Sequence, residues 1–205
     1  MHALIVVAHP DPSSLVHSVA AQIAQGVSAS GPHTYELADL AAEGFDPRFT
    51  RTDLALSVRE APPPADVAAE QARIDRADAL VLVYPIYWWS MPALLKGWID
   101  RVFTNGWAYD STPEEPLVKR LRGRQVHLVA IGGADAGTYA RHGYTTAMRT
   151  QIEHGIFDYC GARVVTSELL LETEGQGTAA HAETARAIGQ GLFSARSRCD
   201  TPNAA

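Results

Sequence analysis

The sequence is poor in cysteine, in basic clusters and in long apolar runs, and each absence excludes a class of protein. Its 205 residues include only two cysteines, Cys160 and Cys199, which lie far apart and form no CxxC pair. A disulfide framework is therefore not expected, and a reducing cytoplasm is the expected location. The formal net charge is −6 and no run is rich in lysine or arginine, so nucleic acid is not an expected partner. No apolar stretch approaches the length of a transmembrane helix, so membrane insertion is not expected either.

Several catalytic motifs are missing as well. The eight histidines form no HExxH pattern, and the chain has neither a paired-cysteine metal motif nor a GxSxG nucleophile elbow. The first loop lacks the Lys-Ser/Thr pair of a P-loop, which disfavours NTP hydrolysis. The segment GQGTAA at residues 175–180 matches the GxGxxA dinucleotide pattern. It lies too near the C-terminus for another strand and an acidic ribose ligand to follow, so we expect a loop that opens the last helix.

The chain alternates short apolar runs with helical patterns. The apolar runs predict strands near residues 3–8, 34–40, 77–85, 125–133 and 162–171. Apolar residues at helical spacing predict helices near residues 16–27, 66–76, 90–103, 146–159 and 178–194. Residues 41–64 are expected to be irregular, and the tail at 195–205 is expected to fray. Strands that are apolar on both faces predict an α/β fold, a five-stranded parallel sheet with helices on both faces, in a single domain over residues 1–205.

The carboxyl ends of three of these strands predict one ligand site, because parallel α/β sheets bind ligands at that edge. In the first loop, AHPDPSSLVHS, Ser13 or Ser14 would cap a helix whose free N–H groups could bind phosphate. On its own this serine is also what ordinary capping requires. Gly132 and Gly133 end the fourth strand, where backbone N–H groups could approach a ligand atom that gains negative charge. A simple turn is the commoner meaning of such a pair.

The stretch YPIYWWSMPALLKGWIDRVF places two adjacent tryptophans between a strand and a helix. Trp98 lies on the apolar face of that helix and is expected in the core. Trp88 and Trp89 lie in the loop, where they would either cap the sheet, fill a subunit interface, or line a pocket for a flat, conjugated ligand. Among the histidines we single out His142, which lies beside Tyr139 in a glycine-flanked loop that follows a strand end.

Four stretches carry a family resemblance: ALIVVAHPDPSSL (3–15), YPIYWWSMPALLKGWIDRVFTNGWAY (84–109), GGADAGTYARHGY (132–144) and YCG (159–161). They resemble the flavodoxin-like NAD(P)H:quinone oxidoreductases, the family of DT-diaphorase and of shorter bacterial relatives that include the ancillary subunit of glutathione-gated potassium efflux. The resemblance covers nearly the whole chain. It implies a flavodoxin-like fold, tightly bound FAD or FMN, NAD(P)H as co-substrate, and a homodimer with active sites at the subunit interface.

The implied activity is that of an NAD(P)H dehydrogenase (quinone), a flavoprotein oxidoreductase that passes a hydride from NAD(P)H through the flavin to a quinone-like acceptor. Two alternatives stay open, namely a regulatory flavin-binding subunit of a membrane transport system and a general flavin or azo reductase. The choice between FAD and FMN, and between NADH and NADPH, is open as well.

The resemblance also implies roles for individual residues. His9, Ser14 and Leu15 would hold the phosphate and ribityl chain of the flavin, and Gly132 and Gly133 would lie by the pyrimidine edge of its ring. Tyr139 and His142 would match the tyrosine and histidine that assist hydride transfer and quinone protonation. No metal is implied. The residues that would flank the ring are Pro85, Ile86, Tyr87, Trp88 and Trp89. The chain departs from the family pattern at Val16, where many members carry asparagine, and in a shorter spacing between Tyr139 and His142.

Overall fold

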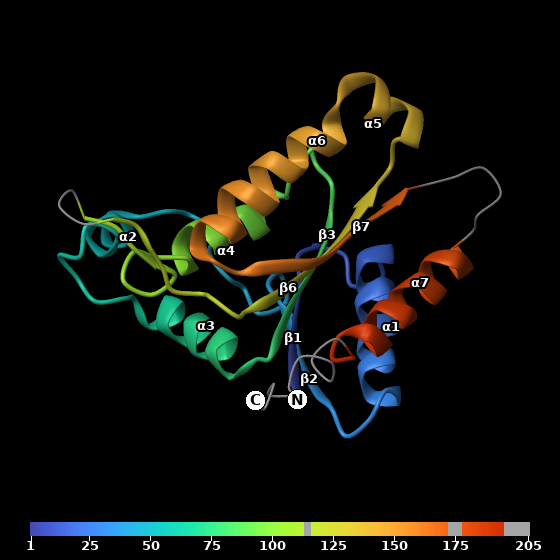
Figure 1. The fold of residues 1–205 in the computed structure, drawn as a ribbon, viewed down its shortest axis with the longest axis horizontal. Coiled ribbons are helices and arrows are strands. Elements are labelled where there is room, and N and C mark those ends of the chain that lie inside the picture. The colour runs from blue at the N-terminus through green and yellow to red at the C-terminus, as the bar shows by residue number, and fades with distance from the viewer. Residues whose placement is uncertain (113–115, 172–177, 195–205) are drawn as a thin grey trace, which may run out of the picture.

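A five-stranded parallel sheet forms the centre of the computed structural model, which describes residues 1–112, 116–171 and 178–194. The strands lie in the order β2-β1-β3-β6-β7, as Figure 1 shows. Their bounds are β1 His2–Val7, β2 Thr34–Asp39, β3 Ala79–Pro85, β6 Gln125–Gly132 and β7 Arg163–Leu171. The predicted α/β fold with a five-stranded parallel sheet is therefore confirmed.

Helices cover both faces of this sheet and divide the core into two layers. On one face α1 (Leu15–Ala29) and α7 (Thr178–Gly191) pack on the side chains of Ile5 and Val81. On the other face lie α3 (Ala65–Arg76), α4 (Ala93–Val102) and the π-helix η1 (Arg149–Asp158). Trp98 of α4 is fully buried in this second layer, as predicted, and its indole N–H donates to Glu70 at 2.8 Å.

The contact between α1 and α7 depends on two glycines that bring the helix backbones together. A Cβ atom at Gly26 would lie 2.3 Å from the backbone oxygen of Arg186, and one at Gly189 would lie 2.1 Å from that of Ile23. No side chain fits between backbones at such distances. The two glycines therefore set how closely α7 approaches the rest of the domain.

Residues 41–64 are not wholly irregular, and on this point the sequence-based prediction was wrong. They contain α2 (Arg51–Ser57), whose first turn is closed by a capping box between Thr50 and Asp53. Asp53 is buried and accepts a hydrogen bond from Nε of Arg101 on α4 at 3.0 Å. The capping box is a local signal for the start of this helix, whereas the pairing of Asp53 with Arg101 cannot be read from the local sequence.

The stretch after Gly132 was predicted as a loop, and most of it is helical instead. Asp135 caps α5 (Ala136–His142) by accepting from the N–H of Thr138 at 2.8 Å, and Gly143 ends that helix with a φ of 68°. Then α6 (Tyr144–Met148) continues directly into η1. The helix predicted over residues 146–159 therefore begins two residues earlier, and its second part is a π-helix. Gly161, with a φ of 86°, marks the end of this run, as predicted.

The remaining differences concern the edges of the molecule. The outer strands β2 and β7 are not buried on both faces, since Tyr35 is 43% exposed and Val165 is 38% exposed. A small antiparallel pair, β4 (Tyr109–Asp110) with β5 (Val118–Lys119), was not predicted. The predicted loop at 175–177 and the predicted frayed tail lie outside the described residues. In the part of the chain that the structure describes, no helix has the length and apolar character needed to cross a membrane.

Candidate ligand site at the strand ends

Three neighbouring strands bring the predicted site residues to one edge of the sheet. The strands β1, β3 and β6 are consecutive in the sheet order, and all three run in the same direction. The loops that follow them therefore meet at their carboxyl ends. The N–H of Ile86 extends the pairing past β3 by donating to the backbone oxygen of Ile131 at 2.8 Å.

The loop after β1 leads into the N-terminus of α1. Some of the hydrogen-bond donors in this loop are already used by acceptors within it. Ser14 is the N-cap, and its hydroxyl accepts from the N–H of His17 at 3.4 Å. Ser13 donates both its N–H and its hydroxyl to Asp11, at 2.8 and 2.7 Å. These bonds are the main cause that lowers the pKa of the Asp11 carboxyl, which is fully exposed. The N–H groups at the start of α1, those of Leu15 and Val16, have no intrahelical acceptor and face the loop.

A chain of hydrogen bonds behind Ser14 was not foreseen. The hydroxyl of Ser14 lies 2.9 Å from Nδ1 of His17, and Nε2 of His17 lies 2.9 Å from Oδ2 of Asp39 at the end of β2. Asp39 is in turn held by the N–H groups of Ala41 and Ala42. The ring of His17, which Asp39 holds in place, thus restricts the orientation of the Ser14 hydroxyl. The sequence alone could have indicated the contact between Ser14 and His17, because His17 follows the capping serine by three residues. The contact between His17 and Asp39 is made only by the fold.

The aromatic loop after β3 is a tight turn with strained backbone. The N–H of each of Tyr87 and Ser90 donates to the backbone oxygen of the other at 3.1 Å, which leaves Trp88 and Trp89 as a two-residue turn. Their φ angles are 50° and 60°. Positive φ at both central positions defines a type I′ turn, which normally carries Asn-Gly or Gly-Gly. Holding two bulky residues there costs about 1–3 kcal/mol each.

Contacts with the rest of the chain offset only part of this strain. Trp89 stacks on Tyr144 with ring centroids 3.7 Å apart and meets Tyr139 edge-on at 5.3 Å, and aromatic pairs contribute about 0.5–1.5 kcal/mol each. Ser90 adds a hydrogen bond to Gln151 at 2.6 Å. Trp88, in contrast, is 94% exposed, and no aromatic ring of the described residues packs on it. Trp88 does not cap the sheet, so its exposed indole favours a ligand or a subunit contact.

The two glycines at the end of β6 have different surroundings. A Cβ on Gly132 would lie 2.6 Å from the hydroxyl oxygen of Tyr139 and 2.8 Å from Cδ2 of Leu171, so this position is filled by neighbours. A Cβ on Gly133 would meet no atom within 4 Å. Tyr139 is 2% exposed, and burial raises the pKa of its hydroxyl, which therefore stays protonated at neutral pH and can donate a hydrogen bond.

These loops enclose a cavity of about 150 Å³. The structure brings together most of the residues predicted around a ring, but His142 is exposed and lies outside the cavity lining. It stacks on Tyr144, with ring centroids 5.1 Å apart. His9 also does not line the cavity, and its Nδ1 accepts from the N–H of Asp11 at 3.0 Å. The lining residues are Ile86, Trp88, Trp89, Gly133, Ala134 and Tyr139.

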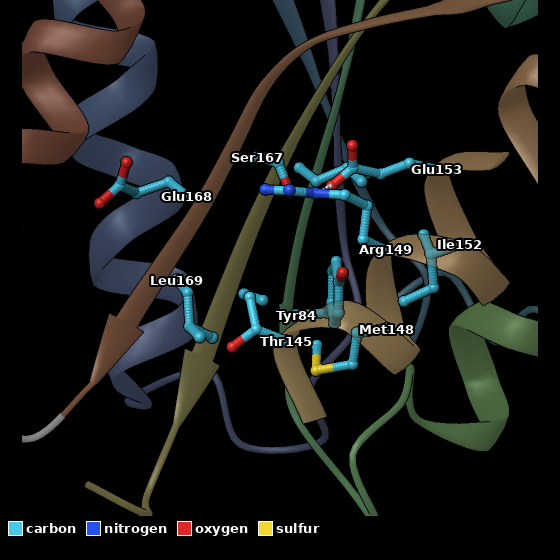
Figure 2. Close-up of a pocket in the computed structure, with 11 residues that line it drawn as sticks. Tyr84, Thr145, Met148, Arg149, Ile152, Glu153, Ser167, Glu168 and Leu169 are labelled. Carbon is cyan, nitrogen blue, oxygen red and sulfur yellow. Dashed lines mark ion pairs between the residues drawn. The ribbon is translucent and has the colours of Figure 1, made fainter. Parts of the chain in front are cut away.

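A second cavity, of about 60 Å³, lies between the helical run of α6 and η1 and the strands β3, β6 and β7. Figure 2 shows Tyr84 of β3 beside this helical run, which carries Met148, with Glu168 on β7 turned to the other side of the strand. Arg149 and Glu153 form an ion pair at its mouth, with N and O 3.6 Å apart. Because its floor is apolar and narrow, we interpret it as space left beneath the wide π-helix. Within the described ranges, no group of histidine, cysteine or acidic residues is arranged to hold a metal ion.

Comparison with known proteins defines the class of this fold and site. A family model described as a flavodoxin-like fold matches residues 1–192, and the chain belongs to this family. The ribosyldihydronicotinamide dehydrogenase (quinone) of Mus musculus is 30% identical over 185 residues, covering 81% of this chain and 79% of the mouse protein.

Solved structures agree. An NAD(P)H:quinone oxidoreductase from Methanothermobacter marburgensis has a TM-score of 0.82 at 31% identity, covering 94% of this chain and 96% of that one. General stress protein 14 of Treponema denticola, solved in complex with FMN, has a TM-score of 0.63 at 28% identity, covering 92% of this chain and 95% of that one. Azoreductases at 17–18% identity share the fold alone.

Proposed function

We propose that the protein is a flavin-dependent oxidoreductase that transfers a hydride from NAD(P)H through bound FAD or FMN to a quinone or a similar acceptor. The observation that carries the proposal is the cavity between the strained aromatic turn and Gly133, at the same sheet edge as the N-terminus of α1. A flat ring with a phosphate-bearing tail would engage both features at once. The quinone-reductase names of the relatives and the FMN complex of the T. denticola protein support the same ligand class.

The residues at this edge fit such a group. The backbone at Gly133 is open and could approach the edge of a ring, which any side chain there would obstruct. Because Ser13 is engaged by Asp11, the phosphate would be held by the N–H groups of Leu15 and Val16 and by the hydroxyl of Ser14. Phosphate binding would favour the orientation in which Ser14 donates its proton outward while its oxygen accepts from the backbone N–H of His17.

A bound flavin would supply the two-electron redox chemistry, taking a hydride from NAD(P)H and giving it to the acceptor. The chain would supply position, shielding and proton donors. Trp88, Trp89 and Ile86 would flank the ring and exclude water from it. Tyr139 would donate a hydrogen bond to charge that develops on the ring or the acceptor. His142, the exposed last residue of α5, would exchange a proton with the acceptor or with solvent.

The first experiment combines binding with turnover. The purified protein should be yellow or should take up flavin, mass spectrometry of the released ligand should identify FAD or FMN, and NADPH should reduce menadione. A colourless protein that takes up neither flavin refutes the proposal. Flavin binding without turnover would instead favour a regulatory subunit.

A variant tests whether Trp88 flanks the flavin ring. Trp88→Gly should weaken flavin binding about fivefold, because a stacked aromatic contact is worth about 1 kcal/mol. The same change should raise the stability of the flavin-free protein by about 1 kcal/mol, because glycine adopts a positive φ without strain. Tyr35→Ala, which removes an exposed ring from the edge strand β2, is the matched control and should change neither. Unchanged flavin affinity in the glycine variant would argue against a ring beside Trp88.

We also propose that the protein is a homodimer and that it works in a reducing cytoplasm, where the buried Cys160 stays unpaired. Aromatic surface at Trp107 and Tyr109 and the long segment 41–64 both favour a dimer by sequence, but the two rings are half-buried in their own chain. The exposed apolar side chains of segment 41–64, on and beside α2, support the dimer better. They are Phe49, Leu54 and Val58, which are 51–56% exposed.

Light scattering at micromolar concentration tests the dimer. The wild type should have twice the mass of one chain, and Leu54→Glu should give monomers, because a charge would have to be desolvated at the contact. Val118→Glu, at an equally exposed apolar position on β5, should leave the dimer intact. A monomeric wild type refutes the proposal.

A further inference from the structure

Tyr144 lies at the centre of a group of stacked rings at the rim of the cavity. The indole of Trp89 lies flat on it, with ring centroids 3.7 Å apart and planes inclined by 12°. The imidazole of His142 is also nearly parallel to it, at 5.1 Å and 26°. Tyr144 itself does not line the cavity. It therefore touches the wall without forming part of it.

The local backbone explains how Tyr144 reaches this place. Gly143 adopts a φ of 68° between α5 and α6, so the chain turns sharply just before Tyr144. This turn carries the first residue of α6 back toward the aromatic turn after β3. The contact thus joins the aromatic turn after β3 to the start of α6, two segments that are distant in sequence.

Trp89 needs such a partner because its backbone does not hold it well. Its φ of 60° is unfavourable for a bulky residue, and the neighbouring Trp88 has the same problem without any ring to support it. Tyr139 supports only the edge of the Trp89 indole and is itself fixed against Gly132. Among the described residues, Tyr144 is the one whose ring stacks on the face of this indole.

We propose that Tyr144 is a positioning residue that fixes the Trp89 indole and thereby sets the width of the cavity and the size of the acceptor it admits. The positioning follows from the ring geometry, whereas the selection of acceptors rests on the proposed function. With the proposed flavin ring in this cavity, the acceptor would bind in the space left beside Trp89, where flat one-ring acceptors would fit a narrow gap and two-ring acceptors would gain from a wider one.

The positioning is tested on the flavin-free protein by acrylamide quenching and near-ultraviolet circular dichroism. Trp98 is buried, Trp88 is already accessible, and the half-buried Trp107 is held by Phe103 and Asp75 rather than by Tyr144, so a newly quenched indole reports on Trp89. Tyr144→Leu keeps apolar bulk but removes the ring, and it should increase the quenched fraction and reduce the aromatic dichroism. Tyr144→Phe keeps the stack and should match the wild type, as should the surface control Tyr35→Ala. A leucine variant with wild-type quenching and dichroism overturns the positioning role.

The selection of acceptors is tested by steady-state kinetics of the flavin-loaded protein with a benzoquinone and a naphthoquinone. Tyr144→Leu should raise KM for the one-ring benzoquinone about tenfold, the lower end of what a reshaped apolar pocket costs, with kcat little changed. KM for the two-ring naphthoquinone should change less, and Tyr144→Phe should restore both values. An unchanged ratio of the two KM values overturns the selection. If the wild type reduces neither quinone, the proposed function fails, and the quenching experiment still decides the positioning.

Discussion

Alanine at Gly132 and at Gly133 should have opposite effects, although the two glycines are adjacent. At Gly132 the new methyl group would lie 2.6 Å from the Tyr139 hydroxyl and 2.8 Å from Leu171, where an ordinary contact needs at least 3.4 Å. Tyr139 is a buried side chain of the cavity wall and Leu171 is a half-buried one at the end of β7, so they must shift or the strand must move. At Gly133 the methyl group would enter open space.

The magnitude follows from two opposing terms. Overpacking of this kind costs about 1–3 kcal/mol. Replacing glycine also restricts the unfolded chain, which returns about 0.4–1 kcal/mol where the backbone tolerates alanine. We therefore expect Gly132→Ala to lower the free energy of unfolding by about 1–2 kcal/mol. Gly133→Ala should leave the stability of the flavin-free protein unchanged or slightly higher, but it should weaken flavin binding about tenfold, because the methyl group occupies the ring edge of the proposed site.

Urea denaturation of the flavin-free variants, followed by flavin titration, separates these effects. With a slope near 2 kcal/mol/M, the Gly132→Ala midpoint should fall by about 0.5–1 M. Wild-type stability in Gly132→Ala would mean that Tyr139 does not rest on this glycine. A destabilised Gly133→Ala, or one that binds flavin as the wild type does, would refute the assignment of open space at Gly133 to a ligand.

Three further predictions concern the scaffold. Arg101→Ala should cost about 3–5 kcal/mol in urea denaturation, because it leaves the buried Asp53 carboxylate without its partner, whereas Lys96→Ala on the same helix removes only an exposed ion pair and should cost less than about 0.5 kcal/mol. Gly189→Ala should lower the melting temperature strongly, with a loss of about 3 kcal/mol, because its Cβ would lie 2.1 Å from a backbone oxygen of α1; an unchanged melting curve would contradict the close crossing. Burial lowers the pKa of His127 to about 4, so the unfolded chain binds a proton that the folded chain resists. Stability should be complete above pH 6.5 and fall as the pH drops toward 4, by about 2 kcal/mol at pH 5, and His127→Gln should remove this part of the pH dependence in denaturation curves.

The parts of the fold that depend on local patterns could be predicted from the sequence. The strands β1, β3 and β6 are continuous apolar runs buried on both faces, and their common edge located the candidate site. The helix α5 was missed although Asp135 and Gly143 are ordinary helix start and stop signals. The cause was that glycine-flanked sequence after a strand was taken for a loop.

Other features depend on contacts that have no local signal. The short α2 has a local capping signal in Thr50 and Asp53, but the partner that holds buried Asp53 is Arg101, which follows it by 48 residues, and that pair is defined only by the fold. The same holds for Asp39 behind Ser14 and for Tyr144 beneath Trp89. Nothing in two adjacent tryptophans predicts positive φ, because residue preferences favour Asn-Gly there. The sheet edge at which the candidate site lies could be predicted from the sequence, but the residues that support the side chains around it could not.

The strained turn at Trp88 and Trp89 also predicts how these two positions should vary among homologues. Most replacements at a type I′ turn, and Asn-Gly above all, would relieve its backbone and raise stability. In a lineage that no longer used the cavity, neutral drift would therefore erase both tryptophans quickly, while the buried strands around them stayed the same. Among homologues of this fold, bulky rings at both positions would separate chains still selected for a ring-binding wall from chains that have kept only the scaffold.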